Sequence, residues 1–274
     1  MHSNQLQRRP FMPHARSPAR LELPSKGELI AIFEEAAARD EVLFRTRQAL
    51  QTGRYVDADG REETLGNIRL TADQVGLLIW LSSRRKTALS VEVGFGMGSS
   101  AAAILAAARA HHAKFEHISF DPGGAGGAKS NVVAAYLLKT FPNEFSLRET
   151  YSQFGLGKLV EERGFESAAL VFIDGDHHFE NTMTDFVLST HLCCVGGYIV
   201  LDDADYPAIE AVVNYVISNR PDFAVSHSVS NTAVFRKIGN DERQWSDFRP
   251  FEIPNRSDWT SRWEQPVSTP ASAE

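Results

Sequence analysis

The sequence predicts an α/β protein in which a mostly parallel sheet is covered by helices on both faces. Short apolar runs in the middle of the chain alternate with segments of helical pattern. The run at 168–173 is entirely apolar and the run at 88–93 mostly so, which is typical of strands buried on both faces, and 115–120 is a further strand-like run. Residues 222–238 are expected to form two strands joined by a short Ser/Asn turn, which adds an antiparallel edge.

Each expected element has its own local signal. A helix is expected over 25–44, because it opens with the capping box S-x-x-E and continues with apolar residues at helical spacing. Thr71 and Gln74 give a second capping box ahead of the apolar stretch VGLLIWL, and the intervening 51–69 is polar and irregular. The remaining expected strands are 88–93, 115–120, 145–150, 168–173 and 197–201, and the remaining helices are 101–110, 132–140, 156–163, 179–192 and 207–219.

We expect a single domain over 25–240, made of N-terminal helices in 25–87 and a core in 88–238. Residues 1–24 are expected to be a disordered arm. The arginines of the first twenty residues resemble a targeting signal, but the prolines among them would break the amphipathic helix that such a signal needs. Residues 241–274 are expected to form a Trp-containing tail that packs over the surface and ends in a disordered Ser/Pro/Ala-rich segment.

Composition excludes several classes of function. A formal net charge of -7 argues against binding nucleic acid or an anionic membrane, both of which need a basic surface. Apolar stretches are too short to span a bilayer. The two cysteines, Cys193 and Cys194, are adjacent and cannot form a disulfide framework, which fits a reducing compartment. We therefore expect a cytoplasmic protein that acts on a small molecule. A homo-oligomer is compatible with the sequence.

A glycine-rich turn follows the first core strand. The stretch VEVGFGMGSS places Gly94, Gly96 and Gly98 before the next helix, where glycines let a ligand approach the backbone and helix N–H groups face it. Many α/β proteins need such a turn for its sharpness alone. The dinucleotide-binding pattern G-x-G-x-x-G is incomplete in either register. Its last glycine is replaced by Ser99 if the pattern starts at Gly94 and by Ala101 if it starts at Gly96.

Two acids accompany this turn. Glu92 lies inside the first core strand, where an uncompensated carboxylate would be costly. Asp121 follows the second strand, and a carboxylate there can accept both hydroxyls of a ribose. Asp121 could instead cap a helix, since Pro122 follows it.

Further carboxylates end the two later strands. Asp174 ends 168–173, and Asp202 and Asp203 end 197–201. Parallel strands share one C-terminal edge, so these acids converge if the strands are neighbours. Clustered like charges either raise a pKa or hold a cation, and carboxylate oxygens suit Mg²⁺ or another hard divalent ion. The alternative is that they are ordinary acids of surface loops.

The loop E-x-G-x-G-x-G and the acid ending the second strand together resemble the cofactor signature of the class I S-adenosylmethionine-dependent methyltransferases, over roughly residues 70–238. The resemblance is closest to the metal-dependent O-methyltransferases, which include catechol, caffeoyl-CoA and macrolide-sugar enzymes. LTADQVGLLIWL resembles the helix ahead of their first strand, and YSQFGL resembles their adenine-contacting Ser-Gln pair. The resemblance to this family implies a Rossmann-like, doubly wound, mostly parallel seven-stranded sheet with an antiparallel final strand and an N-terminal helical extension.

The resemblance also implies roles for particular residues. His177, three residues after Asp174, would take the proton of an acceptor hydroxyl as a general base; the alternative is a helix-start residue that faces water. The metal ligands would be Asp174, Asp202 and Asp203. The cofactor-binding residues would be Glu92, Gly94, Gly96, Gly98, Ser100, Asp121, Ser152, Gln153 and Asp174.

The implied reaction is metal-assisted methyl transfer from S-adenosylmethionine to a hydroxylated small molecule such as a sugar, a natural product or a catechol. One alternative is a metal-independent methyltransferase in which Asp202 and Asp203 only shape the pocket. A second is a nicotinamide-dependent oxidoreductase, which the missing glycine and the acid cluster disfavour. A third is a cofactor-binding protein without catalysis.

Overall fold

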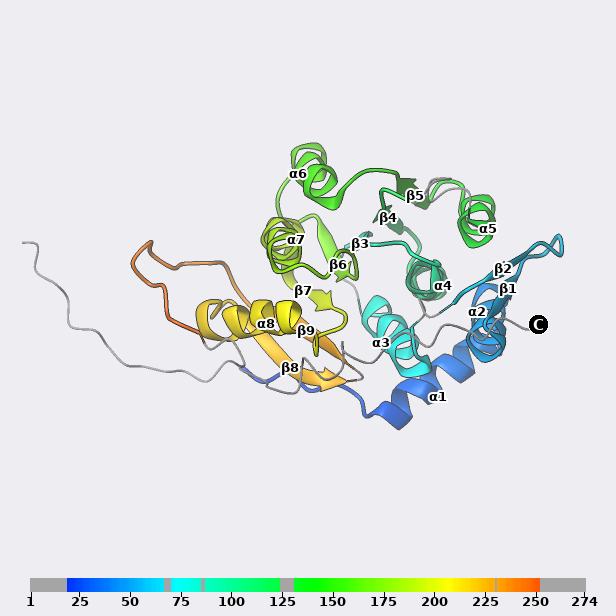
Figure 1. Cartoon of the computed structure of the whole chain (residues 1–274), viewed down its shortest axis with the longest axis horizontal. Coiled ribbons are helices and arrows are strands. Elements are labelled where there is room, and N and C mark those ends of the chain that lie inside the picture. The colour runs from blue at the N-terminus through cyan, green and yellow to red at the C-terminus, as the bar shows by residue number, and fades with distance from the viewer. Residues whose placement is uncertain (1–18, 67–69, 85–86, 124–130, 230, 252–274) are drawn as a thin grey trace, which may run out of the picture.

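The computed structural model describes residues 19–66, 70–84, 87–123, 131–229 and 231–251. The described residues form a central seven-stranded sheet with helices on both faces, and a separate two-stranded hairpin (Figure 1). The predicted arm before residue 19 and the end of the predicted tail lie outside the described residues. The expected fold class is confirmed.

The sheet places its first core strand in the middle. The strands are β3 (Leu89–Val93), β4 (Glu116–Phe120), β5 (Phe145–Arg148), β6 (Ala168–Ile173), β7 (Cys193–Leu201), β8 (Phe223–Val229) and β9 (Thr232–Lys237). Their order is β5-β4-β3-β6-β7-β9-β8; β3 to β7 are parallel, and β9 is antiparallel to both neighbours. The chain therefore winds outward from β3 in one direction and from β6 in the other, and such a switch point leaves a crevice at the C-terminal strand ends.

The helices divide between the two faces of the sheet (Figure 1). One face is covered by α1 (Lys26–Ala37), α2 (Glu41–Thr52), α3 (Ala72–Ser82), α4 (Ser99–His111) and α5 (Val132–Thr140). The other is covered by α6 (Ser152–Arg163), α7 (Phe179–Leu192) and α8 (Pro207–Asn219). Val91 packs into the α6–α8 side and Phe172 of the adjacent strand into the α1–α5 side. The core strands are therefore buried on both faces, as their apolar runs predicted.

The N-terminal segment differs from its prediction in two places. The single helix expected over 25–44 is wrong, because the chain breaks near Asp40, whose carboxylate accepts from the N–H groups of Val42 and Leu43 and so begins α2. The irregular 51–69 contains a hairpin of β1 (Arg54–Val56) and β2 (Glu62–Thr64). Strands of three residues are too short to show a periodic pattern.

Both ends of the described chain pack on the domain. Leu21 N donates to Val225 O at 3.0 Å, and Val225 N donates to Ala19 O at 2.9 Å, so the end of the predicted arm runs along the edge strand β8 and pairs its free backbone groups. Near the other end, Arg249 exchanges two hydrogen bonds with Asn219 of α8. This part of the tail therefore lies against the helix.

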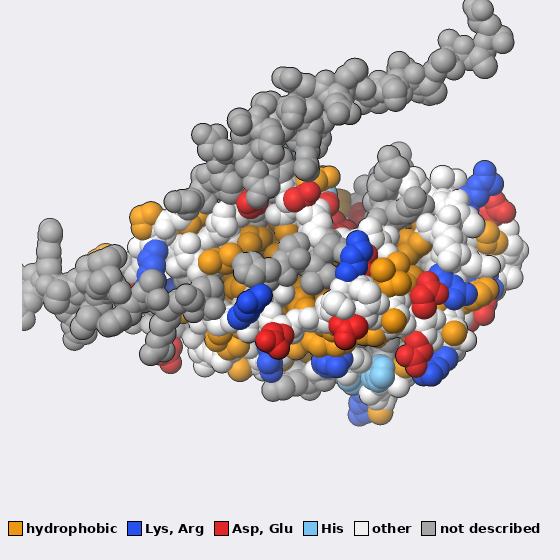
Figure 2. All heavy atoms as spheres, turned by 90° about the horizontal axis from the view of Figure 1, so that it is seen from below, with side chains coloured by type: hydrophobic (Ala, Val, Ile, Leu, Met, Phe, Trp, Pro, Cys, Tyr) orange, Lys and Arg blue, Asp and Glu red, His pale blue; other side chains and the backbone are white. Residues whose placement is uncertain are grey.

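The outer surface shows no dominant sign of charge on the face drawn in Figure 2, where basic and acidic side chains are interspersed with apolar ones. Among the described residues, the helices are too short or too polar to cross a membrane.

The switch point requires a glycine at position 94. Gly94 directly follows β3 with φ +83°, and a Cβ there would lie 1.9 Å from the carbonyl oxygen of Asp174. Asp174 N donates to Val93 O at 2.8 Å, so the backbones that leave β3 and β6 are in direct contact. A side chain would be strained by the left-handed φ and by the overlap.

Replacing Gly94 with Ala should lower the free energy of unfolding by roughly 2 kcal/mol or more, because the left-handed conformation and the overlap both cost energy. Gly157→Ala is the matched control, since nothing lies within 4 Å of a Cβ at that position of α6. The control should be neutral or up to about 1 kcal/mol more stable. Urea unfolding measures both, and equal stabilities would contradict the proposed contact.

A buried carboxyl between α6 and α7 should give the protein a pH-dependent stability. Asp185 of α7 is 1% exposed, and its burial raises its pKa to about 6, although a hydrogen bond with Ser152 of α6 opposes the shift. Below about pH 4 the carboxyl is protonated in both states and costs nothing. Between pH 4 and 6 the unfolded chain loses this proton first, so stability falls as the pH rises.

Asp185→Asn should therefore be more stable than the wild type at pH 7.5, by about 2 kcal/mol. The difference should shrink toward zero as the pH approaches 4, because the wild-type carboxyl is then uncharged. Urea unfolding across this pH range measures the difference. A constant difference at every pH would show that the charge of Asp185 is not its cause.

Candidate active site

A cavity of about 1060 Å³ opens at the C-terminal ends of the parallel strands. Its lining comes from the loop after β3, the ends of β4, β6 and β7, and the starts of α3, α4 and α6. It thus lies at the switch point of the sheet, where the topology leaves a crevice. All the predicted site residues except Glu92 line it.

Asp121 is bound to the glycine loop. Its Oδ2 accepts from Phe95 N at 2.9 Å and from Gly96 N at 3.0 Å, and its Oδ1 accepts from Gly123 N at 2.7 Å. A carboxylate can accept about four hydrogen bonds, so Asp121 retains capacity for a hydroxyl in the cavity. Asp121 thus holds the shape of the loop in addition to lining the cavity, a role that the sequence did not indicate.

The start of α4 adds further donors. Gly98 precedes the helix in the left-handed conformation, with φ +71°, and none of the described side chains caps this end. Ser99 and Ser100 of the first turn line the cavity. The first N–H groups of a helix have no partner within it, so this end favours an anionic group.

Glu92 lies outside the cavity lining. Its side chain is fully buried in β3, and its Oε2 accepts from Ser119 of β4 and lies 3.5 Å from His117 Nε2. Ser90 Oγ contacts the other ring nitrogen of His117 at 3.0 Å. The carboxylate thus belongs to a buried polar network, and its direct contact with a cofactor stays a prediction.

The opposite rim is aromatic. Ser152 and Gln153 begin α6 and line the cavity. Tyr151 and Phe154, which flank this pair, also line the cavity and are 62% and 74% exposed. Neither aromatic residue was predicted from the sequence. Their positions on either side of the Ser-Gln pair were the available signal, because exposed aromatic rings beside a cavity commonly contact flat ligands.

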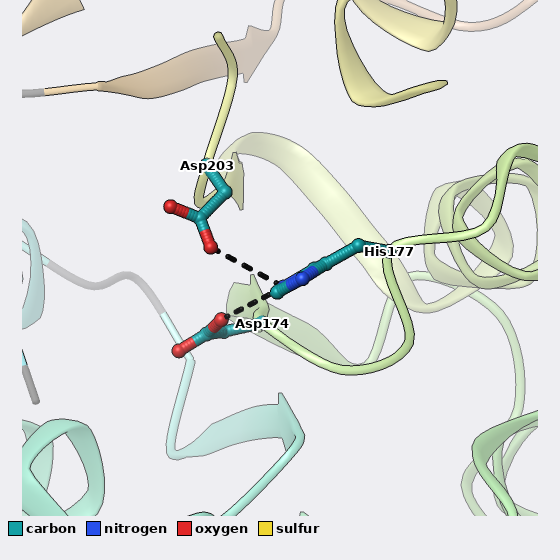
Figure 3. Close-up of side chains that lie close together, drawn as sticks. All are labelled: Asp174, His177 and Asp203. Carbon is teal, nitrogen blue, oxygen red and sulfur yellow. Dashed lines mark ion pairs between the residues drawn. The ribbon is translucent and has the colours of Figure 1, made fainter. Parts of the chain in front are cut away.

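Three side chains converge where β6 and β7 end (Figure 3). His177 Nε2 lies 3.5 Å from Asp174 Oδ1 and 3.3 Å from Asp203 Oδ2, and one ligand atom from each of the three residues lies within 4.8 Å of the others. The His177 ring packs edge-on against Tyr206, with ring centroids 5.1 Å apart. Within the described residues, His177 Nε2 is buried and makes no hydrogen bond. A buried ring nitrogen flanked by two carboxylates has the donor chemistry of a divalent-cation site.

Asp202 is placed differently from its neighbour. It lines the cavity and is 5% exposed, but its Oδ1 accepts from Gln74 Nε2 at 2.7 Å, and it is not part of the converging group. Asp203 has φ +50°, a left-handed conformation that Asp adopts at some cost. The resemblance implied that Asp202 is a metal ligand and that His177 is the catalytic base. In the structure, the side chain that converges with Asp174 and Asp203 is that of His177.

The cluster is electrostatically costly as it stands. Burial raises the pKa of Asp174, and burial together with Asp174 and Asp203 raises the pKa of Asp202 well above its usual range. Burial also raises the pKa of Asp203. The adjacent carboxyl of Asp174, together with that of Asp203, raises the pKa of His177. Each shift favours an added positive charge, which a proton or a bound cation can supply.

Comparison with known proteins shows which proteins this chain is similar to. The family model described as a methyltransferase domain matches residues 91–204. An O-methyltransferase, TomG from Streptomyces achromogenes, in complex with SAM, superposes with a TM-score of 0.55 at 16% identity, covering 79% of this chain and 100% of its own. A cofactor-bound protein from MTB gives 0.57 at 18% identity, covering 80% and 100%. An O-methyltransferase from Bacillus cereus in complex with SAH gives 0.53 at 15%, covering 77% and 100%.

No curated protein matches this chain in sequence. The structural similarities, at these identities, establish a shared fold, and the family model assigns residues 91–204 within it. Residues 91–204 therefore match a methyltransferase-domain model, and the chain shares the fold of these cofactor-bound proteins.

Proposed function

We propose that this enzyme methylates a hydroxyl oxygen of a small molecule with the help of a divalent cation held by Asp174, His177 and Asp203. The observation that carries the proposal is the buried His177 Nε2, which makes no hydrogen bond among the described residues and lies between two carboxylates. Carboxylate and imidazole donors together suit Mg²⁺ or Mn²⁺ and extend to softer divalent ions.

The two halves of the cavity have separate tasks in this proposal. The glycine loop, Asp121 and the start of α6 bind the S-adenosylmethionine, whose sulfonium supplies the methyl group. The acid cluster binds the acceptor end, and a cation there lowers the pKa of a hydroxyl. Because Gly94 contacts the backbone of Asp174, the two halves adjoin, and the protein brings donor and acceptor together at high effective concentration.

His177 is assigned here to metal binding rather than to proton abstraction. A general base must be neutral, but the carboxyls of Asp174 and Asp203 raise the pKa of His177 and favour its protonated form. A divalent cation would displace that proton and use the same nitrogen. This assignment replaces the base role that the resemblance implied.

Metal removal tests the proposal directly. Protein treated with EDTA should lose methyl transfer to a panel of catechols, sugars and other hydroxylated acceptors, and Mg²⁺ or Mn²⁺ should restore it, as followed by mass spectrometry. Asp174→Asn should weaken Mn²⁺ binding at least 10-fold in calorimetry with S-adenosylhomocysteine present, because a ligand oxygen is lost. Asp59→Asn, an exposed carboxyl of the β1–β2 turn, is the charge-matched control. Full activity in EDTA would establish the metal-independent alternative.

The role of His177 has its own test. His177→Gln should weaken Mn²⁺ binding by about 10-fold or more, if the ring nitrogen is a ligand. A variant that binds Mn²⁺ as tightly as the wild type but has lost turnover would instead support the base role. Calorimetry and steady-state kinetics on the same preparations distinguish the two.

A further inference from the structure

One side chain from outside the matched domain reaches the acid cluster. Gln74 belongs to the first turn of α3, and its Nε2 donates to Asp202 Oδ1 at 2.7 Å across 128 residues of sequence. We propose that Gln74 is a positioning residue, which fixes the orientation of Asp202 and so tunes the binding of the cation and the acceptor next to it. The inference deepens the proposed function and rests on it.

The orientation of the Gln74 amide is determined by its other contacts. Its Oε1 accepts from Thr71 N at 2.7 Å and lies 2.9 Å from Thr71 Oγ1. A flipped amide would place its NH₂ group against the Thr71 N–H and its oxygen against the Asp202 carboxylate. Both contacts would then be repulsive, so Nε2 faces Asp202.

The contact acts on one oxygen of Asp202. Gln74 occupies Oδ1, and a carboxylate held by a single fixed donor on one oxygen cannot rotate freely. Oδ2 remains able to bind a group in the cavity that Asp202 lines. Asp202 therefore enters the cavity in one defined orientation, beside Asp174 and Asp203, which interact with it electrostatically.

The helix that carries Gln74 is rigidly placed. Gly76 of α3 lies so close to α1 that a Cβ would be 2.0 Å from Leu29 O, and α3 also packs on α4. Lys26 of α1 lies 3.6 Å from Asp73 of α3. The N-terminal helices thus support a donor to Asp202, which lies beside the proposed ligands Asp174 and Asp203.

Helix capping alone does not require this amide. The capping box of α1 uses Glu28 at the position equivalent to Gln74, and its carboxylate accepts from Ser25 as Gln74 accepts from Thr71. A carboxylate at position 74 would cap α3 equally but would repel Asp202. The donating NH₂ group is the feature that distinguishes the two boxes, and it points to Asp202.

The test is a double-mutant cycle on Mn²⁺ affinity, measured by electron paramagnetic resonance with S-adenosylhomocysteine and without acceptor. Gln74→Met should bind Mn²⁺ about 10-fold more weakly than the wild type. In the Asp202→Asn background the same change should have little further effect, because Gln74 acts through Asp202. Circular dichroism melting establishes that each variant is folded, and Glu28→Ala is the control for the loss of a capping box.

Glu28→Ala should melt at a lower temperature and bind Mn²⁺ as the wild type does. Equal Mn²⁺ affinity in Gln74→Met and the wild type would overturn the inference and leave the proposed function intact, as would additive effects in the cycle. Wild-type protein that binds no Mn²⁺ would overturn both.

Discussion

The contact between the ends of β3 and β6 is the constraint on which the site depends. Gly94 has room for a hydrogen only, because the Asp174 carbonyl lies where a Cβ would be. The loop that begins at Gly94 therefore lies next to Asp174, and both line the cavity. One backbone contact thus sets the separation between the glycine-loop half and the acid half of the cavity.

Around this contact the fold concentrates negative charge in a place of low solvent exposure. Asp121, Asp174 and Asp202 directly follow β4, β6 and β7, at the C-terminal edge of the sheet where the buried apolar segments end. Burial and mutual proximity then raise the pKa of Asp174 and of Asp202, so the site gains most from a ligand that brings positive charge. The partners that the chain itself supplies include His177 and the amide of Gln74, each of which meets one of these carboxylates.

The sequence predicted most of the core and part of the site. Strands such as β3 and β6 were recognised because their apolar runs are strong local signals, and sheet topology alone predicted that Asp174, Asp202 and Asp203 line one cavity. The break at Asp40 was missed, because apolar spacing continues across it. Contacts between distant side chains, such as the one from Gln74, leave no periodic pattern that a single sequence could show.

The predicted base role of His177 stays untested, and the structure favours metal binding as a second role. Its distance from Asp174 along the chain was compatible with a base, a ligand or a solvated helix start, and the structure adds the decisive neighbour, Asp203 from another strand. Whether a cation binds there is the central claim. It is tested most directly by anomalous X-ray diffraction from crystals soaked in Mn²⁺ and S-adenosylhomocysteine. The account predicts one Mn²⁺ peak within coordination distance of Asp174, His177 and Asp203; a cavity that contains S-adenosylhomocysteine and no Mn²⁺ peak, or a peak elsewhere, would contradict it.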